Sequence, residues 1–163
     1  HLSQIPTLRW LYMPRNHGMD DEAGAHLGQL KNLQALDLRS SRISDGTIAE
    51  LKSLSKLREL LIGYTKITDE CLPHIGNLSS LVRLALSGTS ITAKNLAELR
   101  KLPNLKYLVL NETKITNGSV PILSELKTLS ELELKKTKLS ESAISNLRTA
   151  LPDCSVEHEV KAP

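Results

Sequence analysis

The sequence predicts an α/β solenoid with a parallel β-sheet of about seven strands on its concave face and short helices on its convex face. Three observations predict this fold. Leucine accounts for 32 of the 163 residues, whereas the chain has one Trp, three Tyr and no Phe. Leucines recur at an interval of 24 residues, with one interval of 25. Within each interval, an alternating apolar segment typical of a strand precedes apolar residues spaced three apart, as in a helix.

The interval defines six repeats, of which repeat four, LVRLALSGTSITAKNLAELRKLPN, is typical. The repeats start at Leu8, Leu33, Leu57, Leu81, Leu105 and Leu129. We predict one domain over residues 1–163, made of a partial repeat at 1–7, these six repeats and a terminal strand at 154–160. Because residues 1–7 match only the last helical positions of a repeat, the sequence is expected to begin inside a longer array or a longer protein.

Each repeat opens with the segment L-x-x-L-x-L-x, whose period of two is that of a half-buried strand. In repeat three, Leu60 and Ile62 are expected to point into the core and Leu61 to point outward. A small polar residue follows, and its hydroxyl or amide is expected to bond to turn backbone groups of the neighbouring coil. This residue is Asn16, Ser41, Thr65, Thr89, Thr113 or Thr137, according to the repeat.

The second half of each repeat predicts a short helix. In repeat three, Thr68 and Asp69 are candidate N-cap residues, and Leu72 and Ile75 are spaced to share one buried face. Pro73 suits the first turn of that helix. A helix that joins two parallel strands forms a right-handed crossover, so repetition of this unit predicts a right-handed solenoid.

The shared pattern, L-x-x-L-x-L-x-x-T-x-I-T-x-x-x-L-x-x-L-x-x-L, resembles the leucine-rich repeat family over essentially the whole chain. The resemblance implies a parallel sheet on the concave face and helices on the convex face. The T-x-I-T-D-x-x-L motif is similar to the ribonuclease-inhibitor-like and cysteine-containing subclasses. The cysteine-containing subclass is common in substrate adaptors of ubiquitin ligases, but its repeats are longer and carry Cys or Asn where this chain has Thr.

No motif of a catalytic or cofactor site is present in the sequence. It lacks a nucleophile elbow, a phosphate-binding loop and a dinucleotide fingerprint, and its five His have no second ligand at metal-binding spacing. We therefore predict that the chain is not an enzyme and binds no cofactor or metal. The net charge of +3, without a continuous Lys/Arg track on the central strand positions, predicts no nucleic-acid partner. No apolar run approaches ~18 residues, so no membrane partner is expected.

The two cysteines are expected to be free. Cys71 and Cys154 lie four repeats apart, which corresponds to about 19 Å along the solenoid axis. A disulfide requires Cα atoms within ~7 Å of each other. Free thiols are typical of a reducing compartment, so the sequence weakly favours a cytoplasmic location.

The candidate binding residues occupy outward strand positions and the position just after each strand, where core packing does not dictate the residue. All four aromatic residues fall there, beside an outward aliphatic row. Trp, Tyr and Arg are enriched in the residues that dominate binding energy. The predicted protein-binding residues are Trp10, Tyr12, Leu61, Tyr64, Arg83, Ala85, Tyr107 and Val109. For Trp10 and Tyr12 there is an equally good alternative, namely that they cover an end left open by a missing upstream repeat.

The sequence thus predicts a non-catalytic module that binds a protein or peptide on its concave sheet. We expect a monomer, with self-association through the N-terminal edge as the alternative. The second hypothesis is a structural or regulatory domain of a larger enzyme, or a substrate adaptor, whose catalytic part lies outside this chain.

Overall fold

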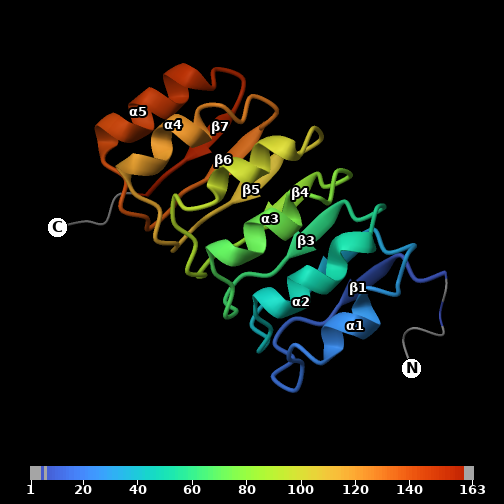
Figure 1. The fold of residues 1–163 in the computed structure, drawn as a ribbon. Helices are drawn as coiled ribbons and strands as arrows, with labels where there is room; N and C mark the ends of the chain where they lie inside the picture. Colours follow the sequence, from blue (N-terminus) through green and yellow to red (C-terminus); the bar gives the residue numbers. More distant parts are fainter. Residues whose placement is uncertain (1–4, 6, 160–163) are drawn as a thin grey trace.

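The computed structural model describes Ile5 and residues 7–159, and within that part seven parallel strands form one sheet in sequence order. The strands follow the chain from one end of the molecule to the other (Figure 1). They are β1 (Trp10–Tyr12), β2 (Ala35–Asp37), β3 (Glu59–Leu61), β4 (Arg83–Ala85), β5 (Tyr107–Val109), β6 (Glu131–Glu133) and β7 (Ser155–Glu157). The predicted α/β solenoid is therefore confirmed.

Short helices form a second layer on one side of the sheet, so the opposite, concave sheet face is open (Figure 1). The α-helices are α1 (Ala23–Leu27), α2 (Asp45–Glu50), α3 (Leu72–Ile75), α4 (Val120–Leu123) and α5 (Glu141–Ala150). The 3-10 helices are η2 (Leu51–Ser53), η3 (Asp69–Cys71), η4 (Leu96–Lys101) and η5 (Asn117–Ser119). Repeat four differs from the expected pattern, because Asn95 adopts a left-handed conformation (φ 58°) and only a 3-10 helix follows it.

Parallel pairing stacks equivalent residues of successive repeats. Leu36 pairs with Leu60, Leu60 with Leu84, and Leu84 with Leu108, each 24 residues further along the chain. These leucines are fully buried, as are the second inward positions such as Ile62. The predicted inward residues are confirmed, and the aliphatic core needs no large aromatic side chain.

At the two ends of the chain, the described residues cover only part of the predicted elements. Strand β7 spans Ser155–Glu157, inside the predicted 154–160, and Val160 lies outside the described residues. Of the predicted partial repeat at 1–7, only Ile5 and Thr7 are described.

The polar residue after each strand bonds within its own turn. Thr65 Oγ1 donates to the carbonyl of Ile62 at 2.6 Å, and Thr89 Oγ1 donates to that of Leu86 at 2.6 Å. The expected bond to the neighbouring coil is therefore wrong for these residues. The hydroxyl lies only three residues after a carbonyl that the turn leaves within its reach, so the local bond forms instead.

Side chains at the start of the helices connect successive repeats. Asp45 accepts hydrogen bonds from the amide (2.9 Å) and hydroxyl (2.6 Å) of Thr68 in the next repeat. Asp69 accepts the same pair from Thr92 at 2.7 and 2.6 Å. This intercoil ladder consists of Asp21–Ser44, Asp45–Thr68, Asp69–Thr92 and Asn117–Ser140. The sequence predicted Thr68 and Asp69 as helix caps, and both side chains also join neighbouring repeats.

The ladder is interrupted at Ala93, which has no carboxylate to offer to repeat five. At the equivalent point of the first repeat, Asp21 accepts a bond from Thr47 Oγ1 at 2.6 Å. The equivalent of Thr47 in repeat five is Ser119, whose hydroxyl is fully buried and has no hydrogen-bond partner among the described residues. A buried hydroxyl without a partner is destabilising.

We expect Ala93→Asp to raise the free energy of unfolding by about 1 kcal/mol, because the new carboxylate can accept from Thr116 and Ser119. Ser119→Ala should also stabilise the chain, by removing the unpartnered hydroxyl. Urea unfolding monitored by circular dichroism measures both changes. If the carboxylate introduced by Ala93→Asp accepts a bond from Ser119, the double variant will be stabilised by less than the sum of the two separate effects. Full additivity would show that this bond does not form.

Acid should weaken the first step of the ladder. Burial raises the pKa of Asp21, but hydrogen bonds from Ser44 and Thr47 outweigh it and hold that pKa below its ordinary value. A lowered pKa stabilises the folded state above about pH 4, and this stability is lost as the pH falls through the folded-state pKa. Wild type should therefore exceed Asp21→Asn in stability at pH 7 but not at pH 2. The free energy of unfolding of both proteins is measured by urea titration at each pH. A difference between wild type and Asp21→Asn that stays constant from pH 7 to pH 2 would contradict the prediction.

Candidate functional site: the concave sheet face

The centre of the concave face is an aliphatic strip on three adjacent strands. Leu61 on β3, Ala85 on β4 and Val109 on β5 are direct register partners. Their side chains are half-buried, because strand neighbours flank each of them and the open side faces solvent. The structure thus brings these three predicted residues together in one row.

A second row beside the strip is held by polar and aromatic contacts. Arg83 Cζ lies 4.7 Å from the centroid of the Tyr107 ring, a cation–π geometry. Arg83 Nε also lies 3.8 Å from Glu59 Oε2, and Tyr12 Oη donates to Glu59 Oε1 at 3.4 Å. We call this set, Tyr12–Glu59–Arg83–Tyr107, the cross-strand chain. It connects four side chains from β1, β3, β4 and β5, so it orients three of the predicted binding residues.

Tyr12 reaches from β1 to β3 over the intervening strand. The two concave residues of that strand, Ala35 and Asp37, are correspondingly buried. Partial burial and the nearby Glu59 carboxylate raise the pKa of the Tyr12 hydroxyl. Asp37 is held by Arg39, whose guanidinium donates to both carboxylate oxygens at 2.9 and 2.6 Å. The hydrogen bond to Asp37 raises the pKa of Arg39.

Trp10 and Tyr12 are the most exposed aromatic residues, at 57% and 55%. They lie on β1, the edge strand of the described sheet. By strand register, Trp10 begins the row that contains Glu59, Arg83 and Tyr107, and Tyr12 begins the row of the aliphatic strip. The Tyr12 hydroxyl crosses between the two rows to reach Glu59. Their exposure agrees with both the binding and the end-covering hypotheses for these two residues.

Tyr64 lies apart from the strip, at the carboxyl edge of the strands. Its hydroxyl donates to Glu112 Oε1 at 3.2 Å, and Lys136 Nζ lies 3.4 Å from the same oxygen. The ring rests on Gly88 (φ +65°), where any added Cβ would overlap it. Tyr64 itself is left-handed, like its equivalents in the other repeats, namely Arg15, Ser40, Gly88, Glu112 and Lys136. Only one of the six is Gly, so composition gave no sign of this turn.

Sequence reasoning missed the acidic partners of the site. Glu59 and Glu112 orient predicted binding residues, although neither was a candidate. The signal was present, since Glu59 occupies the outward position next to Arg83 in the repeat register. Beyond the strip, β6 and β7 present Glu131, Glu133 and Glu157, the last of which pairs with Lys135 at 2.5 Å. The apolar centre is therefore bounded by an acidic end.

The thiols are poor candidates for covalent chemistry. Both cysteines are buried and free. Burial, with Asp45 and Asp69 nearby, raises the pKa of Cys71 far above its ordinary value, and burial also raises that of Cys154. Within the described residues, no cluster of three or more His, Cys, Asp or Glu has metal-binding geometry. The described helices include none with the length and apolar character needed to span a bilayer.

Comparison with known proteins identifies the fold. No protein-family model matches the sequence, and no curated protein matches it. Among solved structures, an internalin (InlF) from Listeria monocytogenes superposes with a TM-score of 0.71 at 22% identity, over 85% of this chain and 38% of its own. Internalin C2 from the same organism gives a TM-score of 0.61 at 24% identity, over 91% of this chain and 70% of its own. Internalins are leucine-rich repeat proteins, so the chain has the leucine-rich repeat fold.

The position of Tyr64 can be tested by its titration. Burial and the hydrogen bond to Glu112 raise the pKa of Tyr64. We expect Glu112→Gln to lower that pKa towards 10, because the neighbouring charge is removed. Gly88→Ala should have the same effect by displacing the ring. Carbon-13 NMR of labelled tyrosines measures both, and Tyr12, which is bonded to Glu59 instead, is the internal control. A Tyr64 pKa unmoved by both substitutions would contradict this contact.

Proposed function

We propose that the chain is a non-catalytic recognition module that binds a protein or peptide on its concave sheet face. The cross-strand chain is the observation that carries the proposal, because its contacts orient Tyr12, Arg83 and Tyr107 beside a half-buried aliphatic strip that is open to solvent on one side. Side chains oriented before binding lose less conformational entropy when a partner arrives. We also propose the ribonuclease-inhibitor-like subclass, on the T-x-I-T-D motif alone.

The composition of this face suits a protein partner. Trp10 and Tyr12 on this face are two of the four large hydrophobic residues that are strongly exposed in the described part of the chain, and both belong to the predicted set. An aliphatic and aromatic centre with a charged surround is the usual anatomy of a protein interface. Both charge signs alternate along the second row, from Glu59 to Arg83 to Glu131, which favours a protein over a nucleic acid.

The test uses peptides selected for binding to the wild-type chain from a random phage-displayed library. We expect the double substitution Tyr107→Ala with Val109→Glu to weaken the selected peptides at least about tenfold, since one aromatic anchor is lost and a charge enters the strip. Isothermal titration calorimetry with the synthetic peptides measures the change. The melting temperature should stay nearly constant, because both side chains lie outside the core.

The control is Lys66→Ala with Lys114→Ala, two exposed positions that lie outside the strands. It should leave peptide affinity unchanged. Peptides that bind both double variants equally well would exclude the concave face as the recognition surface. A large fall in melting temperature for Tyr107→Ala with Val109→Glu would instead show that these residues support the fold.

A further inference from the structure

A second surface with its own chemistry lies at the amino edge of the sheet, where each chain segment enters its strand. Two adjoining hollows run along this edge, with volumes of about 580 and 250 Å³, and they share Gln34 and Lys56 as lining residues. We call them together the amino-edge groove. It crosses repeats one to five and contains none of the predicted binding residues.

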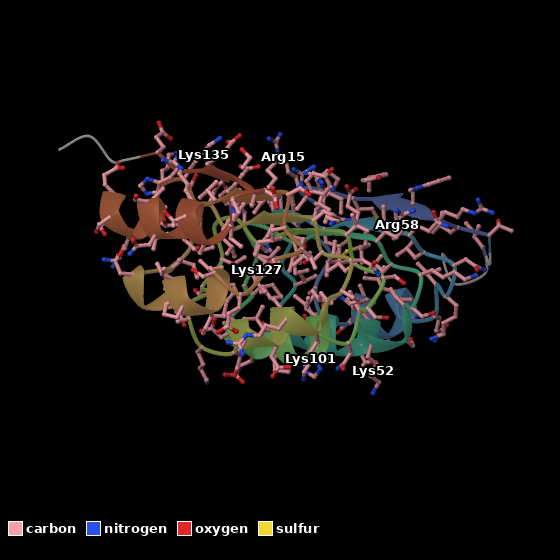
Figure 2. All side chains as sticks on the ribbon, turned by 90° about the horizontal axis from the view of Figure 1, so that it is seen from above. Arg15, Lys52, Arg58, Lys101, Lys127 and Lys135 are labelled. Carbon is pink, nitrogen blue, oxygen red and sulfur yellow. The ribbon has the colours of Figure 1, made fainter. Side chains whose placement is uncertain are left out.

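The groove is lined by cations. Arg9, Lys56, Arg58 and Lys106 are all exposed, and no acidic residue is among the described residues that line either hollow. Figure 2 shows Arg58 beside the sheet, with Lys52 and Lys101 beside the helices on the opposite side of the molecule. The other lining residues are polar, apart from Val82.

Among the described residues, no carboxylate lies within ion-pair distance of these four cations, so their positive charges are not neutralised locally. Arg39, Arg83, Lys94, Arg100, Lys101, Lys135 and Lys136 each have a carboxylate partner within 4.0 Å. In the described part of the chain, Arg9, Arg58 and Lys106 have none. Lys56 Nζ donates to the amide oxygen of Asn32 at 2.7 Å, a neutral partner that keeps the local positive charge.

The backbone holds three of these cations at equivalent positions of the repeats. The carbonyl of Arg9 accepts two amides of the next repeat at 2.7 and 3.0 Å, and that of Arg58 does the same at 2.7 and 2.9 Å. The carbonyl of Lys106 likewise accepts two amides of the next repeat, at 2.9 and 3.0 Å. The groove wall is also tied across repeats, since Ser80 Oγ donates to the carbonyl of Ser55 at 2.6 Å. A site on such a rigid edge needs little rearrangement to bind.

The spacing of the row selects the shape of the ligand. Arg9, Arg58 and Lys106 lie on every second strand, so their backbone positions repeat at about 9.6 Å. A polyproline II segment rises about 3.1 Å per residue with three residues per turn, so every third side chain returns to one face after about 9.3 Å. Carboxylates at every third residue of such a segment would therefore meet successive cations.

We propose that the amino-edge groove binds an extended acidic segment of a protein partner, with carboxylates at positions i, i+3 and i+6. The groove supplies Arg9, Arg58 and Lys106 as the three charge partners, and Lys56 strengthens the field at its centre. This surface is separate from the concave face, so it adds a second contact for the same or another partner.

The probe is a fluorescein-labelled peptide, EPAEPAE, and its control is the isomer EEEPAPA, which has the same composition and charge. Fluorescence anisotropy at low ionic strength measures both affinities, since salt screens exposed charges. We expect EPAEPAE to bind at least about fivefold more tightly, because only its carboxylates match the row. Equal affinity of the two peptides would overturn the proposal.

The protein variants separate the groove from net charge. Arg58→Glu with Lys106→Glu should weaken EPAEPAE at least about tenfold, and the milder Arg58→Gln with Lys106→Gln should weaken it in the same direction. The control, Lys66→Glu with Lys114→Glu, makes the same charge change at the same spacing outside the groove. An equal loss in the control would overturn the proposal.

Two further arms complete the test. Tyr107→Ala should leave EPAEPAE binding unchanged, so that failure here and failure of the concave-face function are distinguishable. A heptathymidylate that binds more tightly than EPAEPAE, and is lost in Arg58→Glu with Lys106→Glu, would make the groove a nucleic-acid site and overturn the peptide assignment.

Discussion

The parallel register of the sheet is the constraint on which the rest of this structure depends. Because each strand pairs with the next at an offset of 24 residues, or 25 at the first pair, every position in a repeat stacks on its equivalents. An inward position must therefore suit the same space in each coil, which leucine fills repeatedly. The outward positions and the two sheet edges are not constrained by core packing in this way. Rows of different chemistry then arise side by side on a single rigid frame, one apolar, one cross-linked and one cationic.

The sequence predicted what repetition dictates. The strand order, the inward leucines and the helical layer were predicted from the 24-residue interval. The structure agrees with these predictions, for example at the buried Leu60 and Ile62. The hydrogen bonds of polar residues were less predictable. Thr65 bonds to its own turn and Asp69 to the next repeat, although both are short side chains near turns. Their choice depends on which carbonyl or amide lies within reach, and periodicity does not contain that distance.

The candidate site shows the same division. Leu61, Ala85 and Val109 were predicted as a row because strand pairing places equivalent positions together. The contacts that orient the aromatic residues depend on rotamers, so Glu59 and Glu112 were missed as partners. Tyr64 was grouped with the strip on its column alone, but the left-handed turn places its side chain at the carboxyl edge.

The interruption of the intercoil ladder at Ala93 has a consequence for cooperativity. In a repeat array, total stability is close to a sum of the repeats and of the interfaces between neighbours. The interface between repeats four and five lacks the ladder carboxylate that joins the preceding pairs, and Ser119 has no hydrogen-bond partner there among the described residues, although Arg100 pairs with Glu125 across it at 2.7 Å. We therefore expect this interface to be less stable than the three that precede it. Amide exchange through sub-global opening should therefore divide the molecule at this junction rather than spread evenly from its ends.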